Sequence, residues 1–206
     1  MKHMIRWTFV VTCLCALGAS AAAQEARSSS SSRPDGFTVG MGAGWDIPTD
    51  IQNVNTASVR FRLANGLTIE PRVDLSVTSD KDDFGMITQE DGTSSFALEA
   101  IARWPMMGRG PVDFLALGGA VIDVFSTDPD GDDNNTTTTS LGLIYGLSVE
   151  YWWGPRWVFS FSATNPVFGR TKISREVAMA DDTSSTTSGF GAIWDPDIIA
   201  MFHLFY

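Results

Sequence analysis

Apolar and polar residues alternate with a period of two along most of the chain. The clearest case runs from Leu67 to Thr78, where Ile69 and Val73 on one face alternate with Glu70 and Arg72 on the other. A period of two places successive side chains on opposite faces of an extended strand, whereas a helix repeats every 3.6 residues. These segments therefore predict strands that lie between an apolar medium and a polar one.

The alternation predicts eight such strands. They are Phe37–Trp45, Thr56–Leu63, Leu67–Thr78, Ser95–Trp104, Val112–Phe125, Ser140–Tyr151, Trp157–Thr164 and a last strand that reaches Tyr206. Short turns follow the second, fourth and sixth strands, at residues 64–66, 105–110 and 152–156, whereas long polar loops at 79–94, 126–139 and 165–188 follow the third, fifth and seventh. This layout is typical of transmembrane hairpins. The sequence therefore predicts an all-β fold, an eight-stranded antiparallel transmembrane β-barrel with short periplasmic turns and longer extracellular loops, and both chain ends on the short-turn side.

The first short turn also predicts a register. A two-residue loop of Asn65 and Gly66 would place every apolar residue of one strand opposite a polar residue of the next. A three-residue loop that begins at Ala64 instead pairs like with like, and it sets Arg60 opposite Glu70. The glycine of this loop is expected to adopt a positive φ.

The N-terminus has the three parts of a secretory signal peptide. A basic start precedes an apolar run from Trp7 to Leu17, and small residues follow as far as Ala23. We expect a signal peptide over residues 1–23, cleaved after Ala23. The alternative is an N-terminal membrane anchor, although the apolar run is short for a spanning helix.

Three segments follow from these patterns: the signal peptide, a flexible periplasmic lead-in over residues 24–36, and the barrel over residues 37–206. Both cysteines, Cys13 and Cys15, fall within the signal peptide, so the exported chain is expected to form no disulfide.

Composition supports a membrane location and excludes a nucleic-acid partner. The 206 residues include 24 acidic and 14 basic side chains, for a formal charge of -10, which repels polyanions. Hydrophobic residues make up 44% of the chain and the mean hydropathy is +0.02, with seven tryptophans. An ordinary soluble domain would have to bury this apolar content in its core. A barrel that faces lipid exposes it.

The C-terminus completes the pattern. One face of the last strand ends in a terminal aromatic residue and carries Ile198, Ala200, Phe202, Leu204 and Tyr206. The sequence resembles the small eight-stranded outer-membrane barrels such as the OmpA transmembrane domain, OmpX and OmpW. The resemblance rests on this C-terminal strand together with the signal peptide, the alternating strands and the loop asymmetry. The resemblance implies a monomer in the outer membrane of a Gram-negative-type cell, surrounded by outer-membrane lipids. It also implies that the C-terminal face is the signal read by the outer-membrane assembly machinery.

Aromatic residues near the predicted strand ends suit the interface between lipid headgroups and hydrocarbon. They are Trp45, Trp104, Tyr151, Trp152, Trp153, Trp157 and Trp194. The alternative is a soluble β-barrel or sandwich that holds these rings in its core.

The polar strand faces carry charges of both signs, which we expect in the barrel interior. They are Arg60, Arg62, Glu70, Arg72, Asp74, Glu99, Arg103 and Glu150. They represent either a selectivity lining or a salt-bridge network. The network is favoured because eight strands leave an interior about wide enough for side chains alone. Gly40, Gly42 and Gly44 in the first strand are expected to admit bulky interior neighbours.

Two further groups suggest chemistry. His203 is the only histidine beyond the signal peptide and its parity turns it toward the interior, but we expect no neighbouring serine to accompany it, which disfavours a catalytic triad. The run with Asp128, Asp130, Asp132 and Asp133 offers oxygen ligands for Ca²⁺ but lacks the spaced glutamate of a calcium loop, so a solvated acidic loop is preferred. We expect no other cofactor.

These observations favour a non-enzymatic outer-membrane barrel with a structural or surface-interaction role and an unidentified surface ligand. The alternative is a narrow, porin-like channel for small hydrophobic or ionic solutes. A lipid-modifying enzyme of the outer membrane is the third hypothesis.

Overall fold

The computed structural model describes residues 33–34, 36–47, 54–83, 88–128, 135–176, 182–191 and 196–206. Within these ranges the secondary structure consists of nine strands. They are β1 (Thr38–Ile47), β2 (Thr56–Arg62), β3 (Thr68–Asp83), β4 (Thr88–Arg109), β5 (Val112–Asp128), β6 (Thr136–Trp153), β7 (Trp157–Arg175), β8 (Thr183–Phe190) and β9 (Asp197–Phe205). A search of the described residues for a helix long and apolar enough to cross a membrane finds none.

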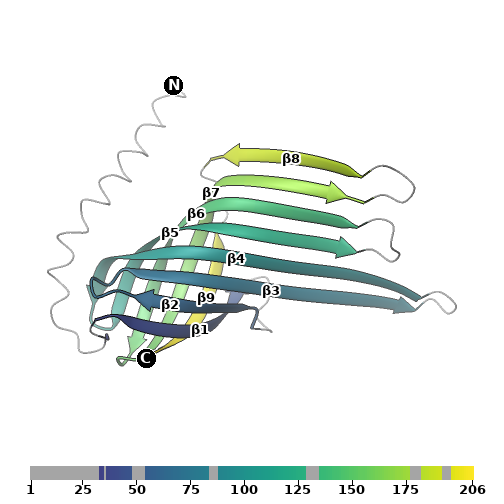
Figure 1. The fold of residues 1–206 in the computed structure, drawn as a ribbon. Helices are drawn as coiled ribbons and strands as arrows, with labels where there is room; N and C mark the ends of the chain where they lie inside the picture. The colour runs from purple at the N-terminus through teal and green to yellow at the C-terminus, as the bar shows by residue number, and fades with distance from the viewer. Residues whose placement is uncertain are drawn as a thin grey trace, which may run out of the picture.

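Eight of these strands close into a ring. Strands β1 to β7 pair in chain order, β7 then pairs with β9, and β9 pairs with β1, all antiparallel. The remaining strand, β8, pairs only with the C-terminal part of β7, from Phe168 to Arg175, and lies outside the ring. The predicted eight-stranded antiparallel barrel is therefore confirmed, with both ends of the ring-forming chain on the short-turn side (Figure 1).

The barrel wall reverses the usual distribution of polarity. Large apolar side chains are exposed around the outside, among them Met41, Phe61, Ile69, Leu98, Leu147, Phe161 and Phe202. Charged and hydroxyl side chains such as Arg60, Glu70, Arg103 and Ser160 are buried within. An apolar exterior around a polar interior suits a barrel enclosed by lipid and contradicts a soluble barrel or sandwich with an aromatic core.

The first hairpin has the register that the sequence predicts. Phe61 pairs with Ile69 and Ser58 pairs with Arg72, as a three-residue loop requires. Gly66 in that loop has a φ of 82°, a conformation that costs glycine little.

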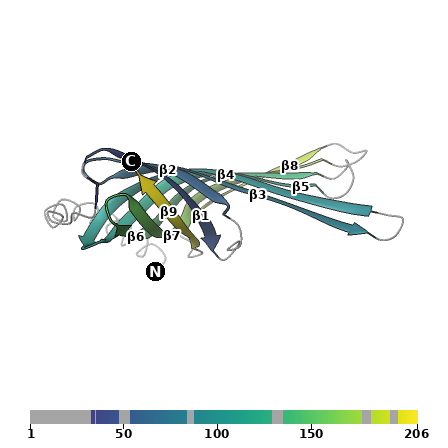
Figure 2. The ribbon, with the colours of Figure 1, turned by 90° about the horizontal axis from the view of Figure 1, so that it is seen from below.

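Strands on one side of the barrel are much longer than predicted. β1, β2 and β9 have 10, 7 and 9 residues, close to the 9–11 that cross a bilayer, whereas β4 has 22 and β7 has 19. The extra residues of β3 to β7, joined by β8, form a projecting sheet that continues beyond the ends of β1, β2 and β9 (Figures 1 and 2). We call this region the projecting sheet.

The projecting sheet corrects the predicted long loops. Parts of 79–94, 126–139 and 165–188 are paired strand, including the Thr- and Ser-rich β8 (Thr183–Phe190). Their sequences are mainly polar, so hydrophobic alternation does not mark them as strands. The turn predicted at 105–110 is also shorter, since β4 continues to Arg109 through an irregularity between Pro105 and Met107.

The predicted aromatic girdle is correct in part. Trp104, Tyr151, Trp153 and Trp157 are exposed, between 43% and 74%, near the short-turn end of the barrel. The prediction is wrong for Trp152, which is only 1% exposed because its position on β6 turns it into the interior. Trp45 is partly buried, and Trp194 lies outside the described residues.

Candidate functional site

Four charged side chains meet in the middle of the barrel, and we call them the central cluster. Arg60 donates from Nε to Glu70 Oε2 at 2.9 Å and from Nη1 to Glu150 Oε1 at 3.0 Å. Arg103 donates from Nε to the same oxygen of Glu70, and its Nη1 lies 3.7 Å from Glu150 Oε1. All four residues are buried. Two cations and two anions thus compensate each other where water is excluded.

Small hydroxyl residues on β6 and β7 complete the hydrogen bonding of the two arginines. Arg60 Nη2 donates to Ser160 Oγ at 2.9 Å, and Arg103 Nη1 donates to Ser148 Oγ at 3.0 Å. Ser162 Oγ accepts from Arg103 Nη2 at 3.3 Å and lies 3.0 Å from Ser148 Oγ. Serines at alternate positions leave room for the long guanidinium side chains that reach across from β2 and β4. The interior is therefore packed by complementary polar groups.

A second ion pair lies one layer above the central cluster, toward the projecting sheet. Arg72 Nη2 donates to Glu99 Oε2, and Arg72 Nε lies 3.8 Å from Asp74 Oδ2. Thr56 Oγ1 donates to Asp74 Oδ1. Arg72 is fully buried, so this pair forms a second layer of charge in the interior.

An apolar group lies inside the short-turn end of the barrel. Trp152, Val158 and Phe205 are buried together, with the Trp152 and Phe205 rings 5.2 Å apart. The Arg62 guanidinium lies over the Trp152 ring, 5.0 Å from its centroid. The sequence predicts Arg62 as part of the charge network, but it lies in this lower layer and not in the central cluster.

His203 of β9 faces the interior and does have a serine neighbour. Its Nε2 lies 2.7 Å from Ser58 Oγ of β2 and 3.7 Å from Glu70 Oε1. The expectation that no serine accompanies it is therefore wrong, because strands remote in sequence are neighbours in the ring. The arrangement still differs from a catalytic triad, in which the acid contacts the other ring nitrogen. Here the hydroxyl and the carboxylate both approach Nε2.

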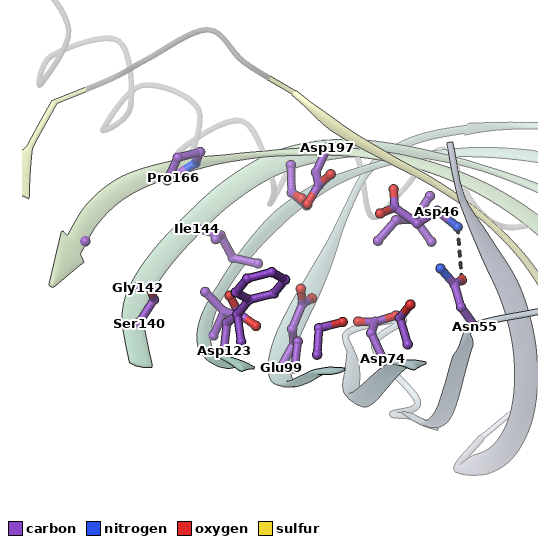
Figure 3. A pocket seen from close by; sticks show the side chains of 18 of the residues that line it. Asp46, Asn55, Asp74, Glu99, Asp123, Ser140, Gly142, Ile144, Pro166 and Asp197 are labelled. Atoms are coloured by element: carbon purple, nitrogen blue, oxygen red, sulfur yellow. Dashed lines mark hydrogen bonds between the residues drawn. The ribbon is translucent and has the colours of Figure 1, made fainter. Parts of the chain in front are cut away.

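The interior opens above the second ion pair into a cavity of about 950 Å³, which we call the acidic cup. Five carboxylates line it: Asp46, Asp74, Glu99, Asp123 and Asp197. Figure 3 shows Asp74, Glu99 and Asp123 on neighbouring strands, with Asp46 and Asp197 across from them. Among the described residues that line the cup, none is basic. The cup therefore favours cations over anions.

The candidate calcium ligands fall mostly outside the described residues. Asp128 ends β5, whereas Asp130, Asp132 and Asp133 are not described. A search of the described part of the chain finds no group of three or more His, Cys, Asp or Glu that could hold a metal ion.

The eight predicted interior charges thus occupy three layers of the barrel. Seven form ion pairs with one another, in two groups: Arg60, Glu70, Arg103 and Glu150 in one, and Arg72, Asp74 and Glu99 in the other. Sequence reasoning missed Asp113, which is 2% exposed and accepts a hydrogen bond from Trp152 Nε1 at 3.1 Å. Its inward parity on the predicted fifth strand is the signal that could have found it.

The C-terminal residues follow the predicted parity. Phe202 and Tyr206 are 38% and 73% exposed on the outer face, and Leu204 and Ile198 are partly exposed, whereas Ala200 is buried. Phe205 and His203 alternate with them toward the interior. The outer face of β9 thus contributes Phe202 and Tyr206 to the exposed apolar belt.

A closed antiparallel ring with an apolar belt outside and ion pairs inside defines a transmembrane β-barrel. A family model described as the outer membrane protein beta-barrel domain matches residues 9–195. The chain belongs to this family, which supports an outer-membrane location. A crystal structure of a major outer membrane protein from Thermus thermophilus is similar at 17% identity, with a TM-score of 0.49, over 82% of this chain and 98% of that one. A search of curated proteins finds no match.

Proposed function

We propose that this chain is a non-enzymatic, non-conducting outer-membrane barrel with a structural or surface-interaction role. The observation that carries the proposal is the filled interior. The apolar group at the short-turn end, the central cluster and the Arg72–Glu99 pair follow one another along the barrel axis. A solute would have to break buried ion pairs to pass, and leaving a buried charge without its partner costs about 3–5 kcal/mol.

The projecting sheet supports the surface-interaction part of the proposal. Its strands run beyond the length that a bilayer requires, and its outermost strand, β8, is exposed along its whole length. Polar, exposed strands at this end offer backbone hydrogen-bonding groups at the sheet edge to a partner.

The proposal also includes export, assembly and surroundings. We expect a signal peptide over residues 1–23, a mature N-terminus at Gln24, assembly by the machinery that reads the last strand, and a monomer in contact with outer-membrane lipids. N-terminal sequencing of the protein from purified outer membranes tests the cleavage site.

An epitope tag tests the surface role. A tag between Asn134 and Asn135 lies at the end that carries the projecting sheet, and antibody should detect it on intact cells. A matched tag at Gly154, in the turn between β6 and β7, should be detected only after the outer membrane is opened. The reverse pattern would contradict the proposal, because the projecting sheet would then face the periplasm.

The acidic cup favours one second candidate, the narrow channel. A cavity of about 950 Å³ lies within the range of small-molecule sites. Uptake of a small cation such as methylammonium into liposomes that contain the purified barrel would support the channel. Exclusion of the cation would support the filled interior.

A further inference from the structure

We infer that the short-turn end of the barrel carries a binding site for a guanidinium group, and that Arg33 of the chain's own lead-in occupies it. Arg33 precedes β1, whereas the site belongs to β4, β5 and the turn between them. Arg33 Nε donates to Asp113 Oδ2 at 2.7 Å, and Arg33 Nη2 donates to Asp113 Oδ1 at 2.6 Å. This bidentate geometry matches the planar fork of an arginine.

The backbone around Asp113 adds two acceptors to the site. Arg33 Nη2 also lies 3.1 Å from the Gly110 carbonyl oxygen and 3.3 Å from the Val112 carbonyl oxygen. The Asp113 side chain is 2% exposed and that of Arg33 is 12% exposed, so the pair is largely shielded from water. One carboxylate and two backbone carbonyls thus accept hydrogen bonds from a single guanidinium group. An exposed surface ion pair contributes little to stability, whereas this pair is shielded from water and makes several contacts.

Gly108 leaves the space that the pair occupies. A Cβ at this position would lie 2.4 Å from Asp113 Oδ1 and 3.0 Å from Arg33 Nη2. The site is therefore shaped by a missing side chain as well as by its acceptors.

Contacts connect the site to the first and last strands of the ring, β1 and β9. Asp113 accepts a hydrogen bond from Trp152 Nε1, and the Trp152 ring packs on Phe205 of the last strand. A Cβ on Gly40 of β1 would lie 3.0 Å from the Phe205 ring, so the first strand is in close contact with the same group. The ion pair therefore fixes Arg33 at the short-turn end of the barrel and supports the layer where β1 meets β9.

A spin label tests whether Arg33 holds the lead-in. The chain has no cysteine outside Cys13 and Cys15, so Ser32→Cys provides a single labelling site in the mature protein. In the otherwise unchanged chain the label should give a broadened, immobilised spectrum. Arg33→Ala should shift most of the signal to a mobile component, whereas Arg27→Ala, which removes a charge from the same lead-in, should not. Equal mobility in all three proteins would overturn the inference.

Two further variants distinguish a guanidinium site from simple charge attraction. Arg33→Lys keeps the charge but loses the fork, so the mobile component should also increase. In Arg33→Ala, added methylguanidinium should shift the Trp152 indole N–H resonance in a saturable manner, and this resonance is assigned by its loss in Trp152→Phe. The shift should disappear in Arg33→Ala/Asp113→Asn. Full immobilisation by lysine, or no saturable shift, would overturn the assignment to guanidinium.

Discussion

At the scale of single residues, parity along each strand decides which side chains face lipid and which face the interior. This rule predicts the inward direction of Arg60, Glu70 and Arg103 from the sequence, and the first turn predicts that Arg60 meets Glu70. The contact of Arg60 with Glu150 is different, because it depends on how far the ring curves and how its strands tilt. The sequence of one hairpin thus predicts which residues pair on neighbouring strands. Contacts across the barrel can be identified only once the ring is closed.

The Arg60–Glu70 pair should behave as a unit. Glu70→Ala leaves two buried arginines short of a partner, so it should lower the free energy of unfolding in detergent by about 3–5 kcal/mol. The double variant Arg60→Ala/Glu70→Ala should lose less than the sum of the two single changes, as a thermodynamic cycle of denaturant unfolding measures. Additive losses would show that the pair does not interact.

Gly42 should be intolerant of even one methyl group. A Cβ there would lie 2.3 Å from the His203 ring, so Gly42→Ala should destabilise the barrel by about 1–3 kcal/mol. The matched control is Gly169→Ala, whose Cβ would have no neighbour within 4 Å. Combining Gly42→Ala with His203→Ala should cost less than the sum of the singles. Equal stability of the two glycine variants would mean that His203 does not pack there.

At the scale of elements, the sequence predicts the ring well and the projecting sheet poorly. Strands within the apolar belt must keep one apolar face, so their alternation is visible. Beyond the belt both faces meet water, and β8 (Thr183–Phe190) is held by pairing with β7 and has no apolar face. The threonines of β6 and β8 favour extended structure, which is the remaining signal. Propensity alone does not distinguish such a strand from a polar loop.

Closure of the ring between β1 and β9 is testable by cross-linking. Asp46 and Ile199 are directly paired, so Asp46→Cys/Ile199→Cys should form a disulfide under mild oxidation. Its denatured chain should then migrate differently on a gel until it is reduced. Asp46→Cys/Met201→Cys, displaced by two residues on the same face, should cross-link far more slowly. Equal rates, or no cross-link in the paired variant, would contradict this register.

At the scale of the whole molecule, the barrel combines buried ion pairs in its interior with an acidic cup at the end that carries the projecting sheet. Composition predicts the membrane class, because an apolar exterior accounts for a hydrophobic content of 44%. It does not predict the cup, since the five carboxylates that line it come from β1, β3, β4, β5 and β9. Only the closed ring brings them to one cavity.

Single-channel conductance in planar bilayers tests the blocked interior most directly. The intact protein should show no large, steady channels, and neither should Asp128→Asn, which alters an exposed carboxylate at the end of β5. Glu70→Ala/Arg103→Ala removes one cation and one anion from the central cluster, and it should also show no large, steady channels, because the Arg72–Glu99 pair and the apolar group at the short-turn end remain. Retained heat-modifiable gel mobility would verify that this variant is folded. Large, steady channels from the intact protein would contradict a filled barrel.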